Sequence, residues 1–299
     1  MVISISISQL LLRTLLGASI NLLMALAAYA RRSVSPSGAF TGFMVGFVIF
    51  IGGGVLFWLH LGVFFISSTL LGHFKGDKKA QSTAQHEKHD QRDGIQVLSN
   101  AGPGAAAAIL YLFYPHPALA AAFAASFAAA NADTWAGEIG MLSKEPPVSI
   151  IHRYRLPTGT SGGVTRLGFY ASAAGAAFIA LLSSAWFFLS GALHATSAAT
   201  AFVTAPALLL GALTLGLLVT VSGVLGALID SILGATVQAG YRCAVTGVTT
   251  ERPATDNRPN LLIKGSPYIT NDTVNFLSVS AASIAAFVLS LFVDIPSFK

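Results

Sequence analysis

Four acidic residues lie inside or at the edges of long apolar segments: Asp133, Glu138, Asp230 and Asp272. A charged side chain in hydrocarbon costs about 2.5–3.5 kcal/mol on insertion scales, so a retained one is by default a candidate for function. Asp133 and Glu138 belong to a polar cluster that also contains Asn131 and Thr134. Such oxygen ligands suit a hydrated Mg²⁺ ion. The alternative is that they only form hydrogen bonds between helices.

The spacing within this cluster limits which side chains can act together. Asp133 and Glu138 are about 140° apart around an ideal helix, so they share a face only if the helix unwinds near Gly137. Asn131 and Glu138 do share a face.

The segment Gly159–Gly168, with the sequence GTSGGVTRLG, stands immediately before an apolar helix. Backbone N–H groups of Gly159, Gly162 and Gly163 can turn toward an anion, and a helix N-terminus adds partial positive charge. The hydroxyls of Thr160, Ser161 and Thr165 and the guanidinium of Arg166 would complete a phosphate site. The pattern is not a Walker A motif, because no Gly-Lys-Ser/Thr ends it. An ordinary capped loop is the alternative.

Two further polar segments interrupt apolar sequence near the C-terminus. One contains Asp230, Ser231 and Gln238, and the other runs Asn271-Asp272-Thr273-Val274-Asn275. In a helix Asn271 and Asn275 would align. Asn271 or Asp272 could instead cap the last helix, whereas Asp230 has no capping role.

The remaining polar residues predict less. Asn100 is a ligand-orienting candidate, Arg153 and Arg155 are basic loop residues near the proposed site, and Ser35 could cap a helix. The histidines are too scattered for a zinc site. The single cysteine, Cys243, excludes a disulfide framework within the chain.

The elements that must position these residues are membrane helices. Of the 299 residues, 54% are hydrophobic and only 10% are charged, whereas soluble domains carry about 25% charged residues. Continuous apolar runs of about 20 residues predict helices that cross the bilayer, and a β-barrel would show alternation instead. We predict an all-α fold, a polytopic transmembrane helical bundle of about eight spans with some broken or half helices.

The predicted spans are separated by clear breaks. Gly52-Gly53-Gly54 and Pro115-His116-Pro117 are turn signals. The apolar run 203–240 is too long for one straight span. It is expected to break near Ser222-Gly223, so that a half-helix carries Asp230. The first helix is expected to be retained, because no basic region precedes its apolar run. The expected boundaries are 8–29, 38–54, 55–72, 99–114, 117–141, 167–190, 203–240 and 273–293.

Basic residues sort to one side of this topology. All 17 Lys and Arg residues except Arg13 and Lys299 fall in alternate connections, and by the positive-inside tendency those connections face the cytoplasm. We therefore interpret the charge of +5 as setting orientation rather than binding nucleic acid. Both termini would lie on the opposite side. We expect a single membrane domain, 1–299, with a flexible polar cytoplasmic loop at 73–98 and cytoplasmic active-site loops at 144–166 and 241–271.

The sequence resembles the membrane family that contains the plant phytyl-phosphate kinase of the vitamin E (tocopherol) pathway, with bacterial, archaeal and animal relatives. The matching motifs run in order over nearly the whole chain. They are QVLSNAGPGA at Gln96–Ala105, NADTWAGEIG at Asn131–Gly140, GTSGGVTRLG at Gly159–Gly168, DSILGATVQ at Asp230–Gln238 and NDTVNFLS at Asn271–Ser278.

The resemblance implies phosphorylation of an isoprenyl monophosphate in the membrane lipid, with Mg²⁺ and a nucleoside triphosphate, CTP or ATP. On that reading Asp133, Glu138 and Asp230 bind the metal, with Asp272 as a further catalytic acid. The Gly159–Gly163 loop, Arg166, Arg153 and Arg155 would bind phosphates. The side chains expected to orient ligands are those of Asn100, Asn131, Thr134, Ser231, Gln238, Asn271 and Asn275.

Three alternatives stay open from the sequence. One is a transporter or flippase for an anionic lipid or solute, which would also use intramembrane carboxylates and broken helices. Another is CTP-dependent nucleotidyl transfer, and the third is a purely structural membrane protein. The isoprenoid, the nucleotide and the oligomeric state are not fixed by the sequence.

Overall fold

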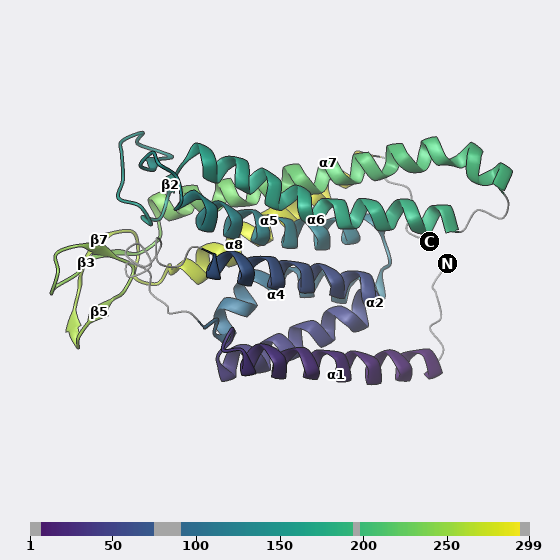
Figure 1. Cartoon of the computed structure of the whole chain (residues 1–299), viewed down its shortest axis with the longest axis horizontal. Coiled ribbons are helices and arrows are strands. Elements are labelled where there is room, and N and C mark those ends of the chain that lie inside the picture. The colour runs from purple at the N-terminus through teal and green to yellow at the C-terminus, as the bar shows by residue number, and fades with distance from the viewer. Residues whose placement is uncertain (1–6, 75–90, 194–197, 294–299) are drawn as a thin grey trace.

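A computed structural model describes residues 7–74, 91–193 and 198–293, and it is a bundle of long helices (Figure 1). The centre of the predicted loop 73–98 lies outside the described residues. Its end is helical, because Asp93 and Gln96 form a capping box that starts a helix at Gly94 rather than Ser99. The helices are α1 Ile7–Ala30, α2 Pro36–His73, α4 Gly94–Phe113, α5 Pro117–Gly140, α6 Arg166–Leu193, α7 Ala198–Thr236 and α8 Asn271–Ser290.

The α2 segment is a hairpin of two arms rather than one straight helix. Gly54 has φ 71° and ψ −158°, a conformation that favours glycine. A Cβ atom on Gly46 would lie 3.4 Å from Cδ2 of Leu61, although these residues would be about 22 Å apart along a straight helix. The two arms run back against each other in Figure 1. The predicted turn at Gly52–Gly54 is confirmed.

The central helix of the bundle is α5, which packs against α2, α4, α6, α7 and α8. Nearly all of its residues from Ala118 to Ala132 are buried. Six helices in the described part of the chain are long and apolar enough to cross a membrane, and α5 is not among them. Because protein rather than lipid surrounds it, α5 can be rich in alanine and still carry Asn131 and Asp133.

The prediction that the apolar run 203–240 breaks near Ser222-Gly223 is wrong. The α7 helix is continuous over Ala198–Thr236. Gly223 lies in it because a Cβ there would be 2.8 Å from the Cβ of Ala128 in α5. Small residues let membrane helices approach closely, so this glycine serves packing and not a bend.

The connections at one end of the bundle contain short strands that we did not predict, although the all-α class stands. In the loop between α5 and α6, β1 (Val148–Ser149) pairs antiparallel with β2 (Gly163–Val164). Between α7 and α8 a β-lobe contains a three-stranded sheet of order β4-β3-β7 and a two-stranded ribbon. Its strands are β3 Gly240–Arg242, β4 Thr249–Thr250, β5 Ala254–Thr255, β6 Arg258–Pro259 and β7 Leu261–Lys264.

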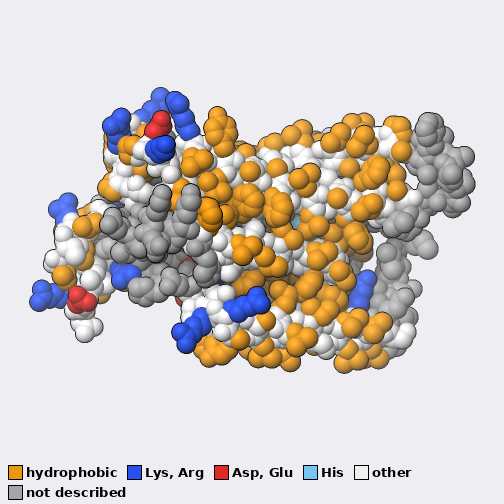
Figure 2. All heavy atoms as spheres, in the orientation of Figure 1, with side chains coloured by type: hydrophobic (Ala, Val, Ile, Leu, Met, Phe, Trp, Pro, Cys, Tyr) orange, Lys and Arg blue, Asp and Glu red, His pale blue; other side chains and the backbone are white. Residues whose placement is uncertain are grey.

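Hydrophobic side chains cover the helical body, whereas most of the visible Lys and Arg side chains gather at the end that carries the β-lobe (Figure 2). We call it the basic end. The outer ends of α1 and α8 lie at the opposite end (Figure 1). With the α2 hairpin counted as two arms, the chain alternates between the two ends as the charge pattern predicted.

Candidate functional site

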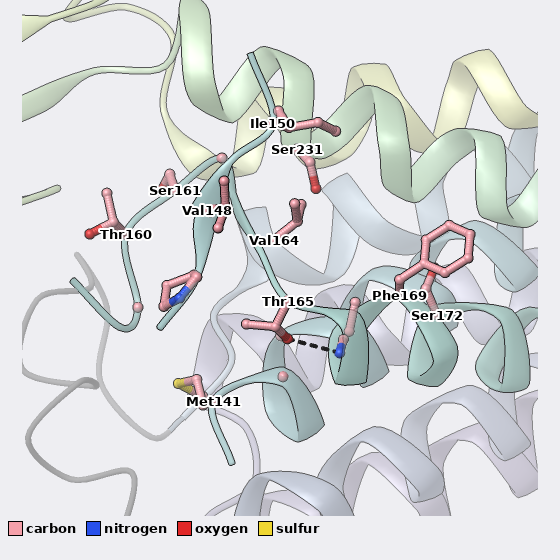
Figure 3. Close-up of a pocket in the computed structure, with 18 of the residues that line it drawn as sticks. Met141, Val148, Ile150, Thr160, Ser161, Val164, Thr165, Phe169, Ser172 and Ser231 are labelled. Carbon is pink, nitrogen blue, oxygen red and sulfur yellow. Dashed lines mark hydrogen bonds between the residues drawn. The ribbon is translucent and has the colours of Figure 1, made fainter. Parts of the chain in front are cut away.

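A cavity of about 780 Å³ opens at the basic end of the bundle. Its walls come from the last turns of α5 and α7, the start of α6 and the loop between α5 and α6. Gln238, Glu251 of the β-lobe and Asn271 of α8 complete them. Figure 3 shows Ser231 entering it from α7 and Ser172 beside Phe169 on α6. Its volume is within the range of small-molecule sites.

Asp133 and Asp230 line this cavity from different helices. Each lies about 10 Å before the end of its helix, so the two reach one depth and interact electrostatically. Ser278 of α8 donates a hydrogen bond from Oγ to Oδ2 of Asp230 at 3.1 Å. Two ionised carboxylates facing one space repel each other, and either a bound cation or a shared proton relieves that repulsion. The structure therefore brings together two of the three predicted metal ligands.

The glycine-rich loop forms another wall of the cavity, and all of Gly159–Gly163 line it. Gly159 and Gly162 have φ of 86° and 81°, which glycine adopts without strain. A Cβ on Gly162 would lie 2.5 Å from the Cα of Ala235, so the loop packs directly on α7. The backbone N–H of Ile150 donates to the carbonyl of Gly162 at 3.1 Å. The loop is thereby fixed between α7 and the β1–β2 pair.

The start of α6 points toward the same cavity. Arg166 is the first residue of the helix, is exposed and lines the cavity. Thr165 accepts a hydrogen bond on Oγ1 from the N–H of Gly168 at 2.9 Å, drawn as a dashed line in Figure 3. The capped helix start and the Arg166 guanidinium together supply positive potential for an anion.

A buried network joins the glycine-rich loop to the β-lobe. Gln238, 1% exposed, donates from Nε2 to Ser161 Oγ at 3.1 Å and to Glu251 Oε1 at 2.9 Å. Ser161 also donates to Glu251 through its hydroxyl. Gln238 therefore holds the loop in position and does not present a free amide to a ligand. Glu251 was not among the predicted site residues, although it lies in the predicted loop 241–271.

Two hydroxyls that line the cavity are buried and have no hydrogen-bond partner within the described part of the chain. They are Ser172 Oγ, on a residue 4% exposed, and Thr160 Oγ1. Burying a hydroxyl without a partner is unfavourable, so both suit a polar ligand. Ser172 gave no signal in the sequence, because a serine in an alanine-rich helix is ordinary.

Glu138 does not lie in the cavity, so the structure does not support it as a metal ligand with Asp133 and Asp230. Because α5 stays helical to Gly140, the 140° separation from Asp133 persists. The Glu138 carboxylate instead lies 3.9 Å from the position of a Cβ on Gly72 and interacts electrostatically with Arg92. The guanidinium of Arg92 also lies over the ring of Phe65, 5.5 Å from its centroid.

Asn131 is a structural bridge rather than a group that orients a ligand. It is fully buried, donates from Nδ2 to the carbonyl of Gly175 at 2.8 Å, and accepts from Ser67 at 2.8 Å. Its amide thus joins α5 to α6 and α2.

Other predicted site residues lie elsewhere. Asn100 and Thr134 bond to carbonyls of their own helices at 3.0 and 2.9 Å. Thr270, not Asn271 or Asp272, caps α8, which leaves Asn271 to line the cavity. The predicted residues that do not line the cavity are Glu138, Asp272, Arg153, Arg155, Asn100, Asn131, Thr134 and Asn275.

The described residues contain no group of three or more His, Cys, Asp or Glu side chains placed to hold a metal ion. A cation at this site would therefore be coordinated by the two carboxylates and by oxygen atoms of a molecule bound in the cavity. Ser278, which supports Asp230, was also missed. Its spacing from Asn271 and Asn275 puts all three on one helix face, so this signal was available.

Comparison with known proteins agrees with the membrane architecture. The family model described as integral membrane protein DUF92 matches residues 19–283. The chain is 29% identical to Protein PGR of Arabidopsis thaliana over 94% of this chain and 97% of the relative. It is 28% identical to an uncharacterized membrane protein of Methanocaldococcus jannaschii, over 76% of this chain and 84% of the relative. No solved structure matches the chain.

Proposed function

We propose that this chain, which belongs to the integral membrane protein family DUF92, transfers a phosphoryl group from a nucleoside triphosphate to an isoprenyl monophosphate. One observation carries the proposal. Two carboxylates from α5 and α7, a glycine-rich loop and a helix start with Arg166 line a single cavity. These are the groups that phosphoryl transfer needs, because it depends on alignment and on neutralised oxygens more than on covalent chemistry by the protein.

Asp133 and Asp230 would hold Mg²⁺. This ion keeps several waters and is commonly bound through one or two carboxylates together with substrate phosphates. The donor set therefore fits without a third acid. Bound there, the ion would neutralise phosphate charge as the transfer proceeds.

The glycine-rich loop and Arg166 would bind the triphosphate. Backbone N–H groups of Gly159–Gly163 and the start of α6 suit an anion. An oxygen of the acceptor monophosphate would attack the γ-phosphorus. The bond between the γ-phosphorus and the oxygen that bridges it to the β-phosphate would break, and a nucleoside diphosphate would leave. No strong general base is needed, because the attacking oxygen is already anionic.

The acceptor would enter from the bilayer. Phe169 and Tyr170 line the cavity and are 50% and 70% exposed, at the start of a helix whose outer face is apolar. An isoprenyl tail could lie along this apolar surface while its phosphate reaches Asp133 and Asp230.

The position of the cavity favours an enzyme over a transporter. Transport sites lie near the bilayer midplane with access to both faces, whereas this cavity lies at the helix ends beside basic loops. By the same positive-inside tendency we propose that the cavity faces the cytoplasm.

The test is purified full-length protein in lipid nanodiscs with Mg²⁺, CTP or ATP, and a panel of prenyl monophosphates. We expect the prenyl diphosphate and the nucleoside diphosphate, identified by mass. Asp133→Asn and Asp230→Asn should each lower turnover by about 100-fold or more, and chelation of Mg²⁺ should abolish it. Asp256→Asn is the matched control, because Asp256 is exposed in the β-lobe with φ 49°, which asparagine tolerates. Release of pyrophosphate would instead show nucleotidyl transfer, and near-normal turnover by both aspartate variants would reject the site.

A further inference from the structure

A second cavity, of about 340 Å³, adjoins the first at the basic end. Gly159, Thr160, Ser161 and Glu251 line both cavities. The glycine-rich loop is therefore a partition with one ligand-accessible space on each side. The Gln238–Ser161–Glu251 network holds this partition.

The walls of the second cavity differ from those of the first. They come from the loop between α5 and α6, the β-lobe and the very end of α7. Neither Asp133 nor Asp230 lines it, and neither do the exposed aromatic residues Phe169 and Tyr170. This cavity is thus separated from the proposed metal site and from the proposed path of the isoprenyl tail.

A flat aromatic surface forms part of the second cavity. The rings of His152 and Tyr154 are stacked, with centroids 5.9 Å apart and planes at 12°. Both side chains line the cavity and both are exposed, so a ligand in the cavity can contact the pair. A planar heterocycle is the chemical group that such a surface binds.

Polar groups lie next to this surface. Thr160 Oγ1 is buried with no hydrogen-bond partner among the described residues. Lys264 donates from Nζ to the carbonyl of Gly234. Burial lowers the pKa of the Lys264 ammonium, and the nearby Glu251 carboxylate opposes that shift. Hydroxyl groups of a sugar would find both donors and acceptors here.

We infer that the second cavity binds the nucleoside part of the triphosphate, with the base on the His152–Tyr154 pair and the ribose beside Thr160. The inference rests on the proposed function, since it assigns the other half of the same donor substrate. The triphosphate would pass along the partition, so that its γ-phosphate reaches the first cavity. One loop would then align both halves of the nucleotide.

The inference can be tested by comparing two ligands that share a triphosphate. Binding of Mg·ATP, Mg·CTP and inorganic triphosphate to the full-length protein in nanodiscs is measured for the wild type and for Tyr154→Ala. We expect the variant to bind both nucleotides about 10-fold more weakly, the loss of one stacking contact, and to bind inorganic triphosphate as the wild type does. Tyr268→Ala is the matched control, because Tyr268 is 88% exposed and lines neither cavity.

Equal nucleotide affinity in Tyr154→Ala and the wild type, or an equal loss for inorganic triphosphate, would overturn the inference. A second measurement is independent of the variant. An ATP analogue with an azide on the base, after irradiation, should label peptides containing residues 149–161 or 249–264, and excess ATP should suppress the label. Labelling confined to other peptides would also overturn it.

These outcomes separate the inference from the proposed function. Base labelling at the second cavity without prenyl diphosphate formation would leave the nucleoside site standing and reject the kinase. If Tyr154→Ala forms prenyl diphosphate with an unchanged KM for the nucleotide, the kinase function stands and the nucleoside site is rejected. A wild-type protein that binds no nucleotide would reject both.

Discussion

Gln238 donates a hydrogen bond from its Nε2 atom to Oε1 of Glu251 over 2.9 Å. Gln238 follows the last turn of α7, whereas Glu251 belongs to the β-lobe. The same amide also reaches Ser161. This one buried side chain therefore connects a membrane helix, the β-lobe and the glycine-rich loop.

Gln238→Leu should destabilise the protein and loosen the loop. The substitution removes the hydrogen bonds that Nε2 of Gln238 donates to Ser161 and Glu251. The half-buried Glu251 carboxylate then has fewer partners, which lowers the free energy of unfolding by about 1–3 kcal/mol. The measurement is the thermal midpoint of the purified protein, with Gln91→Leu as the control at an exposed glutamine. An unchanged midpoint in Gln238→Leu would show that the network contributes nothing to stability.

Gly162→Ala should remove activity through the loop rather than through lost chemistry. Its φ of 81° is unfavourable for alanine, and the added Cβ would lie 2.5 Å from the Cα of Ala235. The backbone strain and the steric clash together should destabilise the loop by about 1–3 kcal/mol or more. The affinity for nucleotide should fall as well. Gly62→Ala, at a helical glycine with nothing within 4 Å of the new Cβ, should bind nucleotide normally. If both variants bind equally well, the loop conformation is not required.

Glu138→Gln separates the structural acid from the two cavity acids. Because Glu138 interacts with Arg92 and not with Asp230, we expect a lower thermal midpoint with an unchanged dependence of turnover on Mg²⁺ concentration. The comparison is with Asp133→Asn, whose residual turnover should need more Mg²⁺. A shifted Mg²⁺ requirement in Glu138→Gln would return this residue to the metal site.

The basic end should face the cytoplasm. In a Cys243→Ser background, a cysteine placed at exposed Arg258 in the β-lobe and another placed at Tyr114, 72% exposed between α4 and α5, should lie on opposite sides. In intact cells a membrane-impermeant maleimide is expected to label only Tyr114→Cys, and after permeabilisation both variants should react. Labelling of Arg258→Cys in intact cells would invert the orientation.

The sequence by itself determined the membrane architecture. In lipid only helices and closed barrels satisfy every backbone group, and long apolar runs without alternation leave helices. The glycine at Gly54 marked the α2 turn. Basic residues in alternate connections indicated which helix ends lie together. That sorting puts Asp133 and Asp230, which are far apart in sequence, near the ends of their helices at the same end of the bundle.

Two predictions made from local sequence were wrong. The capping box of Asp93 and Gln96 was legible in the sequence, yet the helix start was placed later. The 203–240 run is too long for one straight span, so a break was expected at Ser222-Gly223, whereas the glycine there allows close packing on Ala128. The sequence does not distinguish these two uses of glycine, because the difference lies in the neighbouring helix.

Only the tertiary structure decided which polar groups meet. Helical periodicity fixes the angle between Asp133 and Glu138 but not which of them faces α7, because that depends on how α5 is rotated within the bundle. Glu251 joined the site only because the β-lobe folds back over the end of α7. Contacts of this kind depend on the packing of distant segments, and no local spacing in the chain encodes them.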